Sequence, residues 1–487
     1  MDISNFLNQN VFPGSNLRII SKSLPTEIQN IEIEYDENYR IRMRLSCRAE
    51  TRNDANRIIG SLFESSRQPG RKSIIALAGG DYYIAAIRDY FFQSADWRDG
   101  KVYATGEVIS IKFRARNMQP TDHYAYWYLN GDRQFPYTRT QNTDSRRVTK
   151  IQIGGNKSYR LKYSDGFSNS TNHFRFKHTN WNIEVAYSDS KQGIQMPLTS
   201  IRFYGSKPPS QKIVDAASSL YSFLCGKELI NNGYSFLDRN LLPTKAAHRN
   251  SIRNNLSEIK GKLNLYPIPL EYRRLHNSEI RIEELFPSLL EIFVSKFDVL
   301  PIYEAIWLIN QSRYLPLDIQ MQPLATAFDL LKSAWFKKEQ SPSSSKYLKS
   351  EEYAELLGAE FNVIKKRFKG LSFEEKLISK IESANEMSMN ELNFVFLEDI
   401  GLKYDLVEKV VIKERNSVVH GSLKPKNYQE LSGRTLAFGT LLNRIILKLL
   451  SYSGEYIDYS WDNGSELKFY ALPIESPMQD DRLNKKI

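Results

Sequence analysis

The chain has 487 residues, of which 41% are hydrophobic and 25% are charged. This near-average composition excludes a mostly disordered chain, a collagen-like chain and a disulfide-stabilised miniprotein, and the length predicts two or three domains. No run of 18 apolar residues is present, so we expect no membrane span. The first ten residues lack the pattern of a secretory signal, and only Cys47 and Cys225 occur, which favours a reducing cytoplasm.

The net charge of +11 is unevenly distributed. Residues 1–240 contain 33 Lys and Arg against 23 Asp and Glu, whereas residues 241–487 contain 34 against 33. The basic N-terminal half indicates either an acidic partner there, such as nucleic acid, or a solubilising surface. Charge alone does not decide between the two.

The N-terminal region has the period of β-strands. Residues 31–45 alternate strictly, as in a hairpin, with Arg40, Arg42 and Arg44 on the face opposite the apolar side chains. A helix is expected near 53–65. Aromatic and β-branched runs separated by turn signals predict further strands at 101–113, 124–129, 150–153, 159–163, 173–178, 181–187 and 201–204. We therefore predict a β-rich domain over 1–207, an antiparallel sandwich or barrel.

The pattern becomes helical after Pro208 and Pro209, with an amphipathic helix that ends near Gly226. Residues 231–277 are polar and Asn-rich, and we interpret 208–277 as a helical and irregular connector. Helices are then predicted at 279–297, 302–312, 317–336, 351–368, 373–383, 391–396, 404–420 and 428–452. Strands followed by helices, without alternation, predict an α+β multidomain chain whose last domain, 278–487, is an all-α helical bundle.

Six histidines allow the common catalytic motifs to be searched exhaustively. The chain has no H-E-x-x-H, C-x-x-C, P-loop or G-x-S-x-G pattern, so we expect neither a metal nor a cofactor. His173 and His178 lie in an aromatic strand region without acidic neighbours, and we expect surface or half-buried strand residues there.

The segment 410–421, VVIKERNSVVHG, differs from the others because it closes a predicted helix with histidine and glycine. At about 100° per residue, Asn416 and His420 lie within roughly 40° of each other, whereas Arg415 is roughly 140° from His420. A second copy of the helix would bring these groups together. The C-terminal end of a helix also favours an imidazolium, which suits proton transfer near neutral pH.

This segment resembles the signature of HEPN-domain ribonucleases: an arginine, commonly followed by a polar residue, and a histidine after four to six residues. The resemblance covers residues 300–455, and the β-rich region ahead of it makes the whole chain similar to the ApeA family of bacterial anti-phage defence proteins. It implies that the bundle dimerises and that two motifs form a metal-independent site for RNA cleavage. It also implies that the β-rich domain senses a phage-derived or nucleic-acid trigger.

The residue types then predict the chemistry. RNA carries its own nucleophile, the 2′-hydroxyl, and His420 would act on it or on the leaving oxygen as general acid or base. Arg415 would bind the phosphate and stabilise its extra charge, while Asn416 would orient the imidazole or bind a phosphate oxygen. Further RNA contacts are predicted at Lys424 and Lys426, and at a basic helix end: Lys365, Lys366 and Arg367.

Three alternative interpretations exist, of which the first is rejected and the other two stay open. A second match to the spacing, Arg116-Asn117 to His123, contains Pro120 and lies among strands, so we reject it. Arg415 could instead be a solvated charge and His420 a helix cap, which leaves the bundle as a non-catalytic RNA-binding or dimerisation scaffold. Finally, the aromatic run 124–128 fits either a platform for sugar or bases, as in a ligand- or carbohydrate-binding β domain, or the core of a sandwich.

Overall fold

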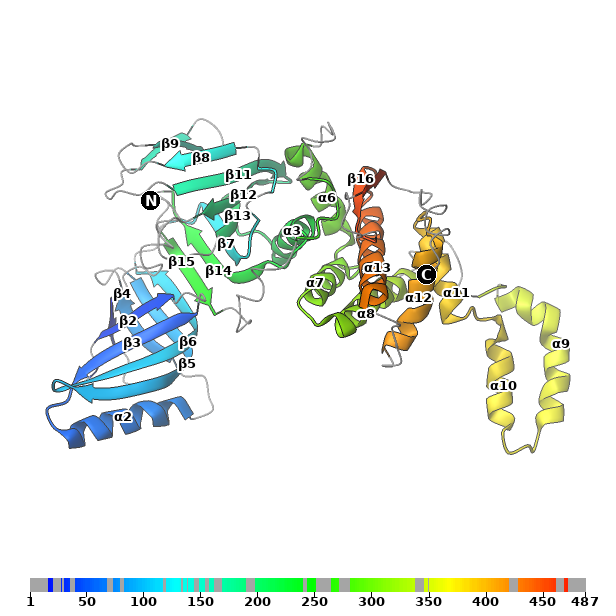
Figure 1. Cartoon of the computed structure of the whole chain (residues 1–487), viewed down its shortest axis with the longest axis horizontal. Helices are drawn as coiled ribbons and strands as arrows, with labels where there is room; N and C mark the ends of the chain where they lie inside the picture. Colours follow the sequence, from blue (N-terminus) through cyan, green and yellow to red (C-terminus); the bar gives the residue numbers. More distant parts are fainter. Residues whose placement is uncertain are drawn as a thin grey trace. The chain divides into compact units, whose positions relative to one another are not determined.

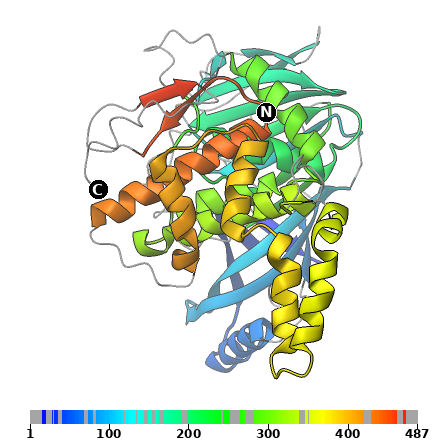
Figure 2. The same ribbon diagram turned by 90° about the vertical axis from the view of Figure 1, so that its right-hand side faces the viewer.

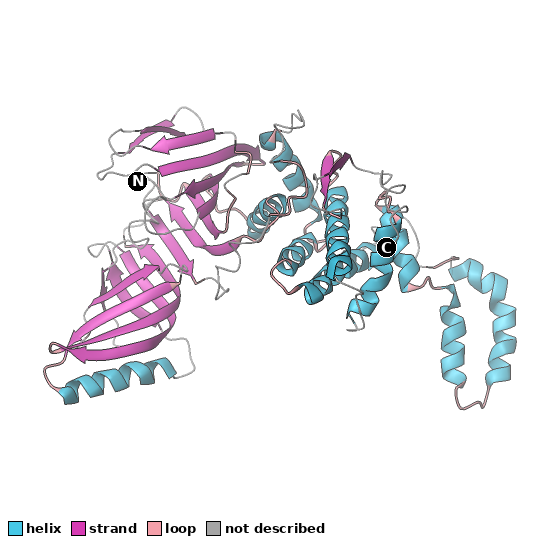
Figure 3. Cartoon of the chain, viewed as in Figure 1, coloured by secondary structure: helices cyan, strands magenta, loops and turns pink. Residues whose placement is uncertain are grey.

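A computed structural model of the chain divides into two compact units. The first comprises 1–264 and 270–291, and the second comprises 265–269 and 292–487. Strands dominate the first unit and helices the second (Figure 3), so the predicted order of a β-rich region before a helical region is confirmed. The structure describes residues 16–20, 28, 30–35, 40–67, 73–78, 83–116, 120–132, 135–137, 139–143, 149–153, 157–161, 169–189, 198–239, 243–250, 264–270, 281–337, 346–348, 350–419, 428–460 and 468–471.

The first part of the β unit is a closed antiparallel barrel (Figure 1). Its strands follow the order β3-β2-β1-β4-β5-β6, and β3 pairs with β6 to close the ring. The predicted hairpin is confirmed, with Ile33 opposite Met43 and Ile31 opposite Leu45. The six strands and the helix beside them are β1 (Asn16–Ile19), β2 (Asn30–Tyr35), β3 (Ile41–Arg48), α2 (Arg52–Arg67), β4 (Ser73–Ala78), β5 (Tyr83–Arg98) and β6 (Lys101–Ala115).

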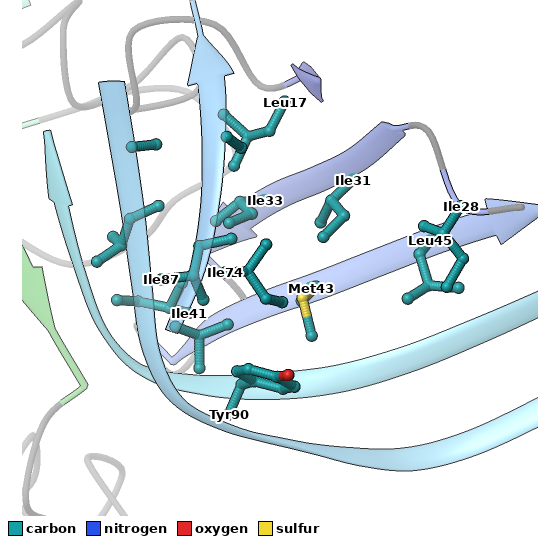
Figure 4. Packing of buried hydrophobic residues seen from close by; sticks show 14 of the residues in the cluster. Leu17, Ile28, Ile31, Ile33, Ile41, Met43, Leu45, Ile74, Ile87 and Tyr90 are labelled. Carbon is teal, nitrogen blue, oxygen red and sulfur yellow. The ribbon is translucent and has the colours of Figure 1, made fainter. Parts of the chain in front are cut away.

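The barrel interior is filled by aliphatic side chains from all six strands (Figure 4). Ile33, Ile41, Met43 and Ile87 have no exposed surface. Because alternate residues of a strand point to opposite faces, these apolar positions turn inward together and the arginines of β3 turn outward. The alternation in the sequence thus produces the barrel core directly.

The sheet continues from β6 through strands that no longer belong to the barrel, in the order β15-β14-β7-β13-β12-β11-β8. Glu184 on β12 lies opposite Arg175 on β11 and Arg202 on β13, with ion-pair distances of 2.5 and 2.8 Å. Burial raises the pKa of Glu184, but the two guanidinium groups outweigh it and lower the pKa overall. Strand bounds are β7 (His123–Leu129), β8 (Arg139–Thr143), β11 (Asn169–His178), β12 (Trp181–Asp189), β13 (Leu198–Tyr204), β14 (Ile230–Leu237) and β15 (Pro243–Arg249), with a separate pair β9 (Thr149–Ile153) and β10 (Lys157–Leu161).

The prediction of an irregular connector is wrong for residues 230–237 and 243–249, which form β14 and β15 between β6 and β7 in the sheet. The physical reason is that their polar residues are buried by neighbouring strands: Asn232 and Ser235 are 1% and 0% exposed. The helix before them, α3 (Gln211–Leu224), is confirmed, and Gly226 ends it at φ 62°. The amides of Gly226 and Lys227 donate back to the carbonyls of Phe223 and Ser222.

The second unit is helical, and its helices agree with the predicted ranges to within a few residues. Helix α8 packs against α7, α12 and α13, and Phe328 of α8 contacts Phe396 of α11 and Phe438 of α13. A short antiparallel pair near the C-terminus, which the all-α prediction missed, accompanies these helices. The bounds are α6 (Ile282–Lys296, shared with the first unit), α7 (Ile302–Ser312), α8 (Leu317–Lys337), α9 (Ser350–Phe368), α10 (Glu374–Glu382), α11 (Met389–Asp399), α12 (Leu406–Val419), α13 (Tyr428–Leu449), β16 (Glu455–Asp458) and β17 (Lys468–Ala471).

Helices α9 and α10 form a hairpin that extends from the rest of the second unit (Figures 1 and 2). Its base is closed by Asn385, which exchanges hydrogen bonds of 2.9 and 2.8 Å with the backbone of Leu348. Ser388 and Glu391 form a capping box at the start of α11. No helix among the described residues combines the length and apolarity needed to cross a bilayer.

Candidate active site

The arginine of the predicted motif lies near the end of α12. This helix begins behind a reciprocal cap: the Asp405 amide donates to Glu408 at 3.0 Å, and the Glu408 amide donates to Asp405 at 2.7 Å. Glu408 also accepts a hydrogen bond from Arg444 of α13 at 2.5 Å, and Glu414 of α12 pairs with Arg434 of α13. The carboxylates of α12 thus fix it to α13 along its length.

The structure describes Arg415 completely but only the helical backbone of Asn416. His420, Lys424 and Lys426 lie outside the described residues. The geometry of the site therefore begins at Arg415, and the other members of the motif stay sequence predictions.

Arg415 is buried against α8. Its Nη2 lies 3.0 Å from Oδ1 of Asp329, and its Nε lies 3.4 Å from Oδ2, so both carboxylate oxygens face the guanidinium. The guanidinium carbon also lies 5.3 Å from the centre of the Phe328 ring. Arg415 is only 2% exposed, whereas the Asp329 side chain is 40% exposed. The alternative in which Arg415 is a solvated surface charge is therefore wrong, because α8 and Phe328 cover it.

A second buried cation shares the same carboxylate. Lys332, one turn after Asp329 on α8, places its Nζ 2.9 Å from Asp329 Oδ1 and 3.0 Å from Asn393 Oδ1 of α11. Burial lowers the pKa of Lys332, while the hydrogen bond to Asp329 raises it and the nearby charge of Arg415 lowers it. Three helices thus contribute to one polar cluster, which we name the Asp329 cluster: Asp329, Lys332, Asn393 and Arg415.

The Asp329 cluster has an excess of positive charge and of donors. Two cations, each 2% exposed, face one carboxylate. Within the described part of the chain, Nη1 of Arg415 and Nδ2 of Asn393 are buried without a hydrogen-bond partner. An unmade buried hydrogen bond is costly, so both groups favour an additional acceptor. Unused N–H donors beside an excess of positive charge are the kind of groups that bind an oxyanion.

Sequence reasoning missed three members of this cluster, Asp329, Lys332 and Asn393. The spacing of Asp329 and Lys332, three residues apart on a predicted helix, was the available signal. Such pairs are common on solvated helix faces, and only tertiary packing buries this one. Asn393 gave no signal.

The predicted basic helix end lies elsewhere. Lys365, Lys366 and Arg367 form the last turn of α9, and Lys365 pairs with Glu382 of α10 at 2.7 Å. This ion pair lies within the α9–α10 hairpin, and the structure does not bring the basic turn to the Asp329 cluster.

The described histidines of the first unit lie on strands and are buried. His123 is on β7, as expected for the rejected second match, and burial lowers its pKa. His173 and His178 on β11 are 8% and 7% exposed, more buried than expected. The aromatic run on β7 is core: Tyr124, Tyr126, Trp127 and Tyr128 are at most 9% exposed.

Among the described residues, no three His, Cys, Asp or Glu side chains lie close enough together to hold a metal ion. Comparison of the chain with protein-family models, with curated proteins and with solved structures gave no match.

Proposed function

We propose that the chain is a metal-independent endoribonuclease of bacterial anti-phage defence, of the HEPN type and similar to the ApeA family. The observation that carries the proposal is the Asp329 cluster, in which the motif arginine is fixed beside a second buried cation and has a free donor. The cluster lies in the helical unit, where the resemblance puts the ribonuclease. Cytoplasmic action agrees with the two buried cysteines, Cys47 and Cys225, which are not joined by a disulfide.

The chemistry of the proposed reaction follows from the residue types. The 2′-hydroxyl of RNA attacks the adjacent phosphorus, the P–O5′ bond breaks, and a 2′,3′-cyclic phosphate and a 5′-hydroxyl result. His420 acts as general acid or base on these oxygens, and Asn416 orients the imidazole or binds a phosphate oxygen. A second copy of the motif supplies the groups that one helix cannot bring together, so the active form is a dimer.

Arg415 exchanges its partner in this proposal. It turns from Asp329 to the phosphate, where its planar donors stabilise the charge of the transition state. Asp329 then stays paired with Lys332 through the 2.9 Å contact, so no carboxylate is left without a cation. Lys424 and Lys426 contact the RNA backbone, and the basic first unit takes the phage-derived trigger.

The test is to incubate purified protein with total RNA in EDTA and to analyse the new ends. We expect cleavage with 2′,3′-cyclic phosphate ends. Arg415→Lys keeps the positive charge toward Asp329 but lacks the planar fork, and we expect its rate to fall by about 10²–10³, as for comparable transition-state donors. Equal rates for the wild type and Arg415→Lys would contradict the role given to Arg415.

A non-catalytic scaffold is the second candidate. The observation that favours it is the burial of Arg415, which is 2% exposed and already paired with Asp329. This candidate predicts no cleavage at high protein concentration with RNA, together with RNA binding or dimerisation. The same incubation therefore separates the two candidates.

A further inference from the structure

The α9–α10 hairpin exposes an unusual amount of apolar surface for the second unit. Leu356 and Val363 on α9 are 63% and 52% exposed, and Phe373 before α10 is 52% exposed. None of the described side chains of the two helices is buried. Helix α10 has 9 residues, and a helix this short is marginal in water without tertiary packing. Apolar side chains exposed together typically mark an interaction site. The hairpin therefore needs a partner.

The charges of the hairpin indicate what kind of partner this is. Residues 351–382 contain six Lys or Arg and seven Asp or Glu, so the hairpin is nearly neutral. A nucleic-acid surface needs a net positive charge, which this segment lacks. Within α9 the charges are separated instead: 350–360 contain four Glu and no basic residue, and 361–368 contain three basic residues and no acidic one. A helix with one acidic and one basic half is complementary to itself when two copies run antiparallel.

The register of that antiparallel pair is set by the spacing of four residues on the outer face of α9, which we call the outer stripe: Glu352, Leu356, Val363 and Arg367. Leu356 and Val363 are seven residues apart, so they lie within about 20° on the helix. Glu352, four residues before Leu356, and Arg367, four residues after Val363, lie within about 60° of each other on the same side. The stripe is symmetric about its midpoint, next to the small Ala359.

We propose that the outer face of α9 is the docking site for α9 of a second copy of this chain, related by a two-fold axis at the midpoint between residues 359 and 360. Leu356 of each copy packs on Val363 of the other, and Glu352 of each copy pairs with Arg367 of the other. Both contacts occur twice, as a two-fold interface requires. The proposal rests on the hairpin and is independent of ribonuclease activity.

The size of the contact determines how it is measured. Helix α9 has 19 residues, about 28 Å in length. One helix pair of this length buries less than the roughly 1,600 Å² of a standard interface, so we expect a dissociation constant in the micromolar range. Sedimentation of the full chain should show the mass double across this range, starting from the 56.5 kDa monomer or from the dimer that the paired motifs form.

Charge reversal provides a test that unfolding cannot imitate. Glu352→Arg and Arg367→Glu should each raise the dissociation constant about tenfold, because two attractive pairs become repulsive. An equimolar mixture of the two single variants should associate as tightly as the wild type, because each reversed charge then faces its opposite. The matched control is Glu375→Arg, the same change on the exposed side of α10, which should dimerise normally.

Three outcomes would overturn the proposal. The first is a wild-type mass that does not rise with protein concentration, and the second is single variants whose dissociation constant equals that of the wild type. The third is a mixture that associates no better than either variant alone. If α9 instead binds RNA, Arg367→Glu weakens RNA binding and Glu352→Arg strengthens it, with no change in mass. A dimer that does not cleave RNA leaves this inference intact and counts only against the ribonuclease.

Discussion

Removing the charge of Asp329 tests the Asp329 cluster most sharply. Asp329→Asn leaves Arg415 and Lys332, each 2% exposed, without a counter-charge. Deleting one partner of a fully buried pair costs about 3–5 kcal/mol. Because the Asp329 side chain is 40% exposed, solvent screens part of the loss, and we expect roughly 2 kcal/mol.

The assay has to report on the second unit alone, because a chain of two units does not unfold in two states. Hydrogen exchange of α8 and α12 peptides measures the local free energy of opening. The matched control is Asp318→Asn in the first turn of the same helix, where only the helix-dipole contribution of about 0.3–1 kcal/mol is lost.

A double-mutant cycle assigns the effect to the two cations. In the Lys332→Met background, Asp329→Asn deprives only Arg415 of its partner, so the cost should fall by about 1 kcal/mol. Equal protection in Asp329→Asn and Asp318→Asn would refute the cluster as described, since Asp329 would then neutralise neither cation.

Two further predictions concern the first unit. Burial lowers the pKa of His248 from its ordinary 6.5 to about 4, so its contribution to folding stability is fully present above pH 6.5 and is lost as pH falls toward 4. Hydrogen exchange of β15 should show a loss of up to about 3 kcal/mol in local stability over this window, and His248→Gln should reduce that loss. An unchanged pH dependence in the variant would contradict the prediction. Gly233→Ala should destabilise the β14–β15 pair by about 3 kcal/mol or more, because φ at Gly233 is 142° and an added Cβ would lie 2.0 Å from the Ala247 carbonyl oxygen. Hydrogen exchange of β14 measures this loss, and exchange equal to that of the wild type would show the prediction to be wrong.

Most of the fold could be predicted from the sequence where the burial pattern is local. The 31–45 hairpin and the helices of the second unit have regular apolar periods, and the structure confirms them. Strand β5 was missed because its alternation is broken: Asp89 has φ 52°, and the register shifts between Phe92 and Ser94. Strands β14 and β15 were missed because sheet neighbours bury their polar side chains, which no local pattern encodes.

The candidate site could be predicted only in part for a similar reason. Arg415 was found from the motif, but its partner Asp329 is 86 residues away in the sequence. Lys332 and Asn393 meet because α8 packs near α11, and neither residue type predicts this hydrogen bond from the sequence. Spacing along one helix identifies the arginine, whereas tertiary structure identifies what it pairs with.

The most direct test of the ribonuclease proposal compares two histidines in one RNA-cleavage measurement with EDTA present. His420→Ala should abolish the appearance of 2′,3′-cyclic phosphate ends, because the general acid or base is lost. His123→Ala, from the rejected motif on β7, should cleave at the wild-type rate. Wild-type cleavage by a folded His420→Ala protein would contradict the account, and loss of cleavage in both variants would indicate destabilisation in place of catalysis.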